Sequence, residues 1–427
     1  MQNLSLNNGG VRQFERRPYF QPFDFSISSR ESRERKFLHL KGKAVDISDG
    51  GIGIQTDYPL EPGHMLWFND GTENKAGLVQ WCIKLDNDYR AGVRLDGKHI
   101  KHLDIATDLF MKRLHEIENK CNATATEADP DMLFKEVTVA MSDVLESCEE
   151  FEIEVRDKSI IRDARVRFQE KTDHILSKGY LINRARIWPQ GYQGDYKMLE
   201  SIYRNTPLSE GIGYYLDLFG LNAPLASGVR NRLKTLEELL KGELLKRQKL
   251  SVLNIACGSC REVIELAPII EKSKAKFTCI DLDNDALSFA ADRLSYTSIS
   301  PLFSNQVKLR KYNALRMFDH ELNINEFGKQ DIIYSIGFFD YLQSDFLVTL
   351  FKALYDLLNP GGKLITSFKD TNRYDHRAFH WIVDWDGFLQ RTEDDFMGIF
   401  SDANIPFSSI SETREESGII VFYVISK

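Results

Sequence analysis

The most constraining feature of this 427-residue chain is a regular alternation of short apolar strands and helical segments from Ser251 onward. It starts with residues 251–262, SVLNIACGSCRE, where an apolar strand runs into a turn of small residues and then into a helix. Such alternation favours a doubly wound, mostly parallel sheet whose ligand lies beyond the carboxyl ends of the strands. Residues 405–426 are instead typical of two strands joined by a charged hairpin. We therefore predict a Rossmann-like α/β domain at residues 250–427, with its ligand at the first turn.

The turn of small residues does not have the composition of a phosphate-binding loop. A dinucleotide fingerprint needs G-x-G-x-x-G, whereas residues 256–261 contain only Gly258. The stretch resembles motif I of the class I S-adenosylmethionine-dependent methyltransferases, with the small Cys257 and Cys260 in place of glycines. Asp281 ends the second strand, Asn313 ends the third, and Asn359-Pro360-Gly361-Gly362 precedes the fifth, in the order of that family.

The resemblance implies a methyltransferase sheet that holds S-adenosyl-L-methionine, with Asp281 accepting from the ribose hydroxyls and Asn313 meeting the adenine amine. The residues expected at the cofactor are Asn254, Ala256, Cys257, Gly258, Asp281, Leu282, Asn313, Ala314, Ser335 and Gly337. Ordinary turn chemistry also explains these positions, since Asp281 is a suitable helix N-cap and Asn313 a suitable loop residue. For Gly361 and Gly362 we favour the interpretation that they form an ordinary turn.

An aromatic stretch precedes this domain. Residues 179–219 are dense in glycine and aromatic side chains, which is unusual for a plain surface helix. We expect a loop that covers the site, with Tyr192 and Tyr196 near the cofactor, because functional loops are held against a scaffold. The alternative is that these aromatic residues only cover an apolar edge of the next domain.

Methyl transfer from a sulfonium is an in-line displacement, so the protein mainly aligns the nucleophile and excludes water. A carboxylate acceptor needs no general base, and no convincing base is evident. The candidates for catalytic roles are Tyr341, Arg373 and His376, with Arg373 able to bind a carboxylate bidentately. His376 and His380 share a helical spacing, but they lack a carboxylate partner at motif spacing, so we expect no metal site.

Residues 150–427 also resemble extracellular-factor 3-hydroxypalmitic acid methyl ester biosynthesis proteins, through GYLINRARIWPQGYQGDY, GIGYYLD and the methyltransferase domain. That resemblance implies a fatty-acid carboxyl group as the methyl acceptor. A protein-carboxyl methyltransferase keeps the chemistry and changes the acceptor, and a non-catalytic effector with a ligand-binding domain is the alternative from another class.

From Lys36 onward, five or six short strands separated by turn residues predict a small antiparallel barrel. The arginine cluster RQFERRPYF and the later DISDGG resemble the PilZ domain, whose arginine loop and D/N-x-S-x-x-G turn bind cyclic di-GMP. The residues implied to bind it are Arg12, Arg16, Arg17, Asp46, Ser48 and Gly51. Only Arg12 and Arg16 keep the family's R-x-x-x-R spacing, because the register from Arg17 ends at Gln21.

The predicted domains are a PilZ-like barrel at 1–118, a small polar linker at 119–130, a helical segment with the site-covering loop at 131–249, and the methyltransferase domain at 250–427. A formal charge of −8 argues against broad nucleic-acid affinity. No apolar run is long enough to span a bilayer, the N-terminus lacks a secretory h-region, and the six cysteines are scattered, so we expect a cytoplasmic protein with free thiols. We expect a small-molecule or lipid-like acceptor and regulation by cyclic di-GMP.

Overall fold

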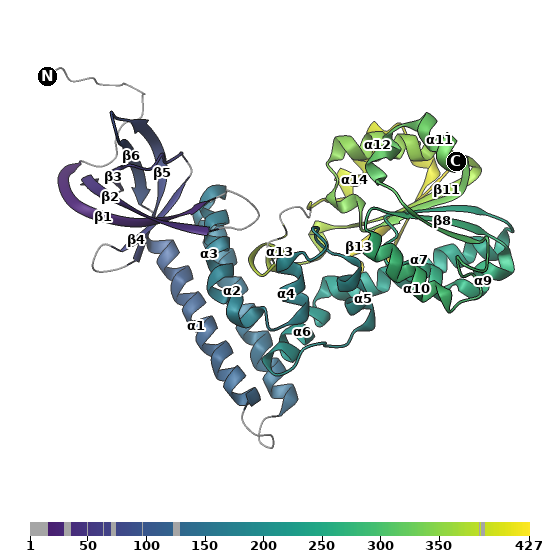
Figure 1. Cartoon of the computed structure of the whole chain (residues 1–427), viewed down its shortest axis with the longest axis horizontal. Helices are drawn as coiled ribbons and strands as arrows, with labels where there is room; N and C mark the ends of the chain where they lie inside the picture. The colour runs from purple at the N-terminus through teal and green to yellow at the C-terminus, as the bar shows by residue number, and fades with distance from the viewer. Residues whose placement is uncertain are drawn as a thin grey trace. The chain divides into compact units, whose positions relative to one another are not determined.

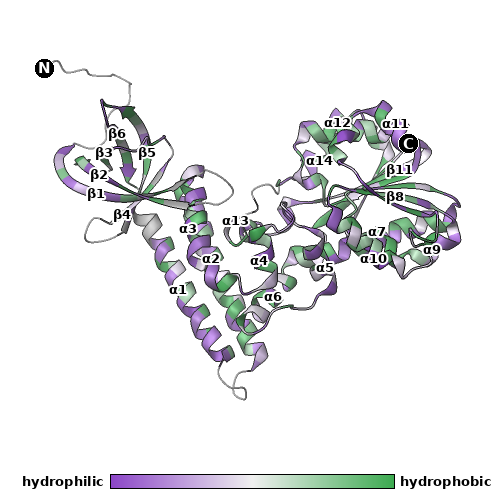
Figure 2. Ribbon diagram, in the orientation of Figure 1, coloured by the Kyte–Doolittle hydropathy of each residue, from purple (hydrophilic) through white to green (hydrophobic). Residues whose placement is uncertain are grey.

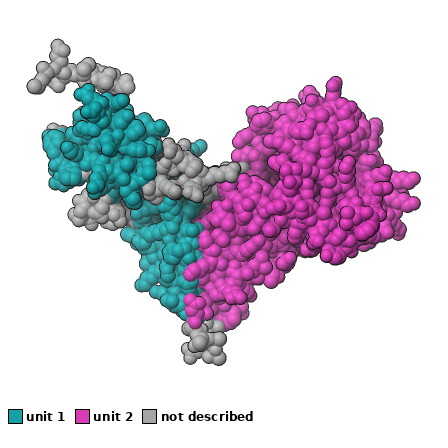
Figure 3. Space-filling model, in the orientation of Figure 1, with its two compact units in different colours: residues 1–120, 138–175 teal, residues 121–137, 176–427 magenta. Residues whose placement is uncertain are grey.

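The computed structural model describes residues 16–29, 36–48, 50–62, 64–69, 74–95, 97–122, 129–383, 385 and 389–427. The chain forms two compact units, one of residues 1–120 and 138–175 and the other of residues 121–137 and 176–427 (Figure 3). Each unit has its own apolar core. We describe them separately.

The first unit begins with a closed antiparallel barrel of six strands in the order β1-β2-β3-β6-β5-β4 (Figure 1). Alternate residues fill its interior, as in β1, where Phe25 and Ile27 are buried and Asp24 is exposed. The predicted small antiparallel barrel is confirmed. Its strands are β1 Arg17–Ser29, β2 Lys36–Ser48, β3 Gly51–Thr56, β4 Met65–Asn69, β5 Asn74–Lys84 and β6 Tyr89–Leu95.

Long helices follow the barrel, namely α1 Gly97–Asn122, α2 Pro130–Val155 and α3 Lys158–Leu176. In α1 the buried residues Leu103, Phe110 and Leu114 recur at helical spacing, which gives the hydrophobic and hydrophilic bands visible in Figure 2. Arg167 of α3 stacks on the Trp67 ring of β4 at 4.1 Å, so α3 packs directly on the barrel.

The second unit opens with helices that lead into the sheet: α4 Tyr180–Ile187, α5 Tyr196–Arg204, α6 Ile212–Asn222 and α7 Pro224–Lys246. Buried leucines from Leu225 to Leu244 line one face of α7. This face packs in the same core as the sheet residues Val252 and Ile332. The helical middle segment predicted from the sequence is confirmed.

The sheet of the second unit has seven strands in the order β12-β13-β11-β10-β7-β8-β9. The pairs that join β11, β10, β7, β8 and β9 are parallel, and β13 runs antiparallel to both β11 and β12. The strands are β7 Ser251–Ile255, β8 Lys276–Asp281, β9 Val307–Lys311, β10 Gln330–Ile336, β11 Leu358–Lys369, β12 Ile410–Arg414 and β13 Ile420–Ser426. The predicted sheet with its final antiparallel pair is confirmed.

Helices cover both faces of this sheet (Figure 1). Adjacent residues of β7 point to opposite faces, so Val252 packs in the core that holds α7, while Leu253 packs in the other core with α12. The helices are α8 Arg261–Glu265, α9 Ala267–Ser273, α10 Asn284–Ser295, α11 His320–Phe327, α12 Ser344–Leu357, α13 Arg377–Trp381 and α14 Glu393–Asp402. The single helix expected after Arg261 is split into α8 and α9, because Pro268 starts a new helix and cannot donate a backbone hydrogen bond.

The chain moves from β7 to β8 and β9 on one side and returns to β10 on the other. The carboxyl ends of β7 and β10 therefore flank the switch point of the sheet, where doubly wound folds bind ligands. Across the described residues, no helix combines the length and apolar character needed to cross a membrane.

Candidate active site

The turn after β7 is tightly wound and is attached to the end of β8. Ala256, Gly258 and Cys260 all have positive φ, of 54°, 52° and 51°. The Gly258 N–H donates to Asp281 Oδ2 at 2.8 Å, and the Cys257 N–H donates to the Ile280 carbonyl at 3.0 Å. Burial raises the pKa of the Cys257 thiol to about 12, so it stays protonated and is a poor nucleophile.

Asp281 is the centre of a small group of polar contacts at the end of β8. Its second oxygen accepts from the Asp283 N–H at 2.9 Å, and burial raises the pKa of its carboxyl group. Asp283 caps α10 and accepts from the Tyr192 hydroxyl at 2.9 Å. Beside them the apolar Leu282 side chain is 59% exposed. The structure thus brings the predicted residues Gly258, Asp281 and Tyr192 to one edge of the sheet.

Other predicted cofactor residues use their side chains internally. The Asn254 amide donates to Glu262 Oε1 at 2.8 Å, and the buried Ser335 hydroxyl donates to the Ile255 carbonyl at 2.9 Å. Asn313 lies at the end of β9 and caps the short helix Ala314–Phe318 by accepting from the Leu315 N–H. These residues lie at the carboxyl ends of β7, β9 and β10, but the Asn254 and Ser335 side chains point into the protein.

The aromatic stretch from the middle of the chain lies against these strand ends. Glu200 of α5 accepts from the Ser259 hydroxyl at 2.8 Å and from Arg261 at 3.2 Å, which ties α5 to the turn after β7. Tyr196, at the start of α5, is buried, and its Cβ would lie 3.8 Å from a Cβ placed on Gly258. The predicted pair Tyr192 and Tyr196 therefore borders the turn.

The same stretch also reaches the segments that follow β10 and β11. A Cβ atom on Gly194 would lie 2.8 Å from the Tyr341 hydroxyl, so only glycine allows this approach. The Arg186 Nε donates to the Ile382 carbonyl at 2.8 Å, and the Trp385 Nε1 donates to the Ala185 carbonyl at 2.9 Å. Residues 185–200 thus form a cover that contacts the segments after β7, β8, β10 and β11 at the carboxyl edge.

Tyr341 belongs to the short helix Phe339–Tyr341 after β10. Its pKa is raised, mainly by burial and next by the negative charge of Asp340. Asp340 is itself buried and forms an ion pair with Lys369 at the end of β11. Burial lowers the pKa of Lys369 to about 8, against the opposing effect of Asp340.

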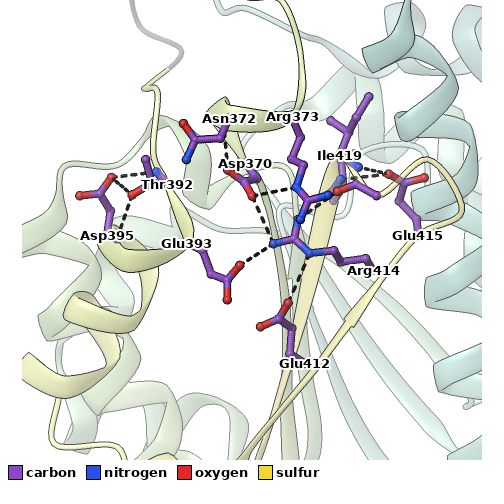
Figure 4. Close-up of polar contacts among 12 residues, drawn as sticks. Asp370, Asn372, Arg373, Thr392, Glu393, Asp395, Glu412, Arg414, Glu415 and Ile419 are labelled. Carbon is purple, nitrogen blue, oxygen red and sulfur yellow. Dashed lines mark hydrogen bonds and ion pairs between the residues drawn. The ribbon is translucent and has the colours of Figure 1, made fainter.

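Arg373 and His376, the other predicted catalytic residues, lie on the segment after β11. Asp370, at the start of this segment, forms ion pairs with Arg414 and Arg373, as Figure 4 shows. The N–O distances are 3.2 Å to Arg414 and 3.7 Å to Arg373. Arg373 is half exposed. Arg414 forms a second ion pair with Glu393 of α14, and so it links the segment to α14 and to the final hairpin. The structure places Arg373 beside this hairpin, with Gly418 as its neighbour.

His376 precedes α13, and its ring meets that of His380 at a centroid distance of 5.7 Å. The described ranges contain no group of three or more His, Cys, Asp or Glu residues placed to hold a metal ion.

Sequence reasoning missed Arg232, a buried arginine in α7. Its Nη1 would lie 2.7 Å from a Cβ on Gly337, which has a φ of 89° at the end of β10. The signal was present in the sequence, because Arg232 occupies a position on the apolar face of α7 between Val229 and Leu236. A cation at such a position is unusual and marks a specific environment.

The predicted dinucleotide site lies at one end of the barrel in the first unit. Asp46 pairs with Arg16 at 2.6 Å through one oxygen and with Arg90 at 2.8 Å through the other. A Cβ on Gly51 would lie 2.8 Å from the Val93 carbonyl oxygen, so this turn also needs glycine. Ser48 donates to the Gly51 carbonyl at 3.3 Å.

Arg17 is exposed at the start of β1, and Arg12 lies outside the described residues. Gln21 accepts from the Tyr19 hydroxyl at 3.2 Å. Arg90 was not predicted, because it follows the arginine cluster by some 70 positions and only the β3·β6 pairing brings it near Asp46.

Comparison with known proteins identifies the domain that carries the sheet. Residues 253–364 match the family model described as a methyltransferase domain, which confirms the predicted enzyme class, a methyltransferase. No curated protein matches the chain.

Three solved structures serve as examples of those to which this chain is similar. A possible exported protein from Bordetella parapertussis has 14% identity and a TM-score of 0.47, with 75% of this chain and 96% of that chain covered. Magnesium protoporphyrin IX methyltransferase from Synechocystis PCC 6803 with bound SAH has 14% identity and a TM-score of 0.36, covering 48% and 85%. An O-methyltransferase family protein from Burkholderia thailandensis has 15% identity and a TM-score of 0.35, covering 48% and 59%.

Proposed function

We propose that the chain transfers the methyl group of S-adenosyl-L-methionine to a carboxylate oxygen, such as that of a 3-hydroxy fatty acid, and that cyclic di-GMP regulates this activity. The observation that carries the first part is the Gly258 to Asp281 hydrogen bond, which joins the turn after β7 to the end of β8. This contact lies at the switch point of a sheet that matches a methyltransferase domain.

The residues present fit this cofactor. Asp281 offers a carboxylate to the two ribose hydroxyls, and the exposed Leu282 beside it offers an apolar surface to the adenine ring. Gly258 carries no side chain, so in this proposal its backbone approaches the methionine part closely. When bound, the cofactor supplies an electrophilic methyl group on a sulfonium.

The protein's own contribution is alignment and exclusion of water. Residues 185–200 cover the carboxyl edge, where Gly194 approaches Tyr341 and Trp385. A tyrosine hydroxyl is protonated near neutral pH, and burial raises the pKa of Tyr341 further, so in this proposal its hydroxyl donates a hydrogen bond to the methyl acceptor. A protonated tyrosine cannot serve as a base, and this agrees with an acceptor that is already ionised.

The segment after β11 supplies the groups that receive the acceptor in this proposal. Arg373 is half exposed, and among the described residues its ion pair is the long 3.7 Å contact with Asp370, so its guanidinium can turn towards an incoming carboxylate. His376 lies three residues further along the same segment and is proposed to line the entry of the acceptor.

Regulation is proposed through the barrel, which we take to be PilZ-like. Asp46 holds Arg16 and Arg90 side by side, and guanidinium groups at such a spacing fit a guanine edge or a phosphate. Binding of the dinucleotide would have to replace one or both contacts with Asp46. The proposal implies that the cyclic dinucleotide and the cofactor change one another's affinity, as linkage requires.

Calorimetry tests both parts. S-adenosylmethionine and cyclic di-GMP are titrated separately into the full chain and then each in the presence of the other. Absence of cofactor binding rejects the enzyme proposal and favours a non-catalytic effector, whereas absence of dinucleotide binding rejects the regulation.

The acceptor is tested in cell lysate with methyl-labelled cofactor and the purified chain, followed by lipid extraction. Label in the lipid fraction supports a fatty-acid carboxylate. Label confined to protein rejects the fatty-acid acceptor, and release of that label by mild alkali would indicate a protein-carboxyl methyl ester instead.

A further inference from the structure

Arg232 is a buried cation that has no charged partner among the described residues. It lies in the middle of α7 and is 3% exposed, and its Nε has no hydrogen-bond partner. Within the described part of the chain Arg232 forms no ion pair, although arginine offers five N–H donors. Buried charges are normally paired, so such an arginine needs another source of acceptors.

The neighbours of Arg232 do not supply that charge. Glu262 is the carboxylate that acts on it, but the Glu262 Oε1 already accepts from Asn254 at 2.8 Å and from Tyr334 at 2.7 Å. Burial also raises the pKa of the Glu262 carboxyl group. Tyr203 of α5 provides only a neutral hydroxyl.

The guanidinium group lies where a ligand would be bound. Its Nη1, Cζ and Nη2 all come within 3.4 Å of a Cβ position on Gly337, so it lies against the backbone at the end of β10. This strand end is paired with β7, whose following turn carries Gly258. Lys369 is another buried cation of this region, and the charge of Arg232 helps to lower its pKa. The ion-pair partner of Lys369 is Asp340.

We propose that Arg232 is a carboxylate-binding residue, which receives an anionic group of a ligand bound at the carboxyl edge between β7 and β10. The planar fork of arginine matches a carboxylate through two parallel N–H donors. This inference rests on the proposed function, which supplies two sources of that group. One is the amino-acid carboxylate of the cofactor, and the other is the carboxylate of the acceptor.

The test uses the full chain and the variant Arg232→Gln, which keeps an amide donor but removes the charge. The matched control is Arg230→Gln on the same helix, since Arg230 donates to the Leu221 carbonyl at 2.9 Å and has no part in the proposed site. Calorimetry measures the binding of three ligands. They are S-adenosylhomocysteine, 5′-methylthioadenosine, which lacks the amino-acid group, and 3-hydroxypalmitate in the presence of S-adenosylhomocysteine. Thermal unfolding checks that each variant is folded, and Arg232→Lys keeps the charge if Arg232→Gln does not fold.

If Arg232 binds the cofactor, Arg232→Gln weakens the binding of S-adenosylhomocysteine about tenfold or more and leaves the binding of 5′-methylthioadenosine unchanged. If it binds the acceptor, 3-hydroxypalmitate alone is weakened to that degree. Arg232→Lys shows a smaller loss in the same titration, because the charge remains and the fork is lost. A folded variant that binds every probe as the parent does overturns this inference alone, whereas a parent chain that binds no S-adenosylhomocysteine overturns the proposed function with it.

Discussion

Replacement of Asp281 by asparagine tests the two roles that the structure gives to this carboxylate. Its oxygens accept from the backbone N–H groups of Gly258 and Asp283 at 2.8 and 2.9 Å. An amide has one oxygen, so it keeps one of these contacts and turns an NH₂ group towards the other donor. A hydrogen bond to a charged group contributes about 1.5–3 kcal/mol, so Asp281→Asn is expected to lower the free energy of unfolding by about 2 kcal/mol.

The effect on the cofactor is separate from this loss of stability. The proposed ribose contact needs an acceptor for two hydroxyls, and loss of one charge-assisted bond of about 1.5–3 kcal/mol weakens binding roughly 10-fold to 150-fold. Calorimetric titration of S-adenosylmethionine into parent and variant measures it, and denaturant unfolding measures the stability. The matched control is Asp319→Asn, because Asp319 caps α11 and asparagine caps a helix equally well.

A reduced stability together with unchanged cofactor affinity would refute the reasoning. Asp281 would then only brace the turn after β7, and the cofactor would have to lie elsewhere.

Two further predictions concern other parts of the chain. Arg16→Ala and Arg90→Ala should each weaken cyclic di-GMP binding about tenfold or more in calorimetry, because each removes a charge-assisted donor beside Asp46. If both variants bind the dinucleotide as tightly as the parent, this end of the barrel is excluded as the site. The pKa of Lys369 is lowered to about 8 in the fold, so between this value and the ordinary value of about 10.4 the unfolded chain binds more protons. The free energy of unfolding should therefore rise with pH across this window by up to about 1.4 kcal/mol per pH unit. This rise is measured relative to the double variant Asp340→Leu/Lys369→Met. Parallel pH curves for the two proteins would contradict a lowered pKa of Lys369.

Each of these predictions has a control within the chain. Arg113 lies on α1 in an exposed pair with Asp143, so Arg113→Ala should leave dinucleotide binding unchanged. Lys352 is exposed on α12, so Lys352→Met should keep the pH dependence of the parent.

The elements that sequence reasoning predicted well are those set by local pattern. The alternation around β7 and β8, the small-residue turn with Gly258 and the acidic residue Asp281 all follow from strand periodicity and turn chemistry. The predicted neighbours Gly258 and Asp281 are in direct contact, because parallel pairing of β7 with β8 aligns their carboxyl ends.

The groups that sequence reasoning missed depend on contacts between distant segments. Glu200 and Arg232 come from helices before the sheet, and each meets a residue far along the chain, Ser259 and Gly337 respectively. Arg90 reaches Asp46 only through the pairing of β3 with β6. No local motif encodes these distances, although the place of Arg232 on an apolar helix face was a visible anomaly.

The most direct test of the central claim is methyl transfer by the purified full chain. The chain is incubated with S-adenosylmethionine that carries a deuterated methyl group and with 3-hydroxypalmitate, and the products are measured by mass spectrometry. We predict a methyl ester that carries the label, with its formation greatly reduced in Asp281→Asn. Retention of all label in the cofactor, with 3-hydroxypalmitate unchanged although both ligands bind, would contradict the proposed reaction.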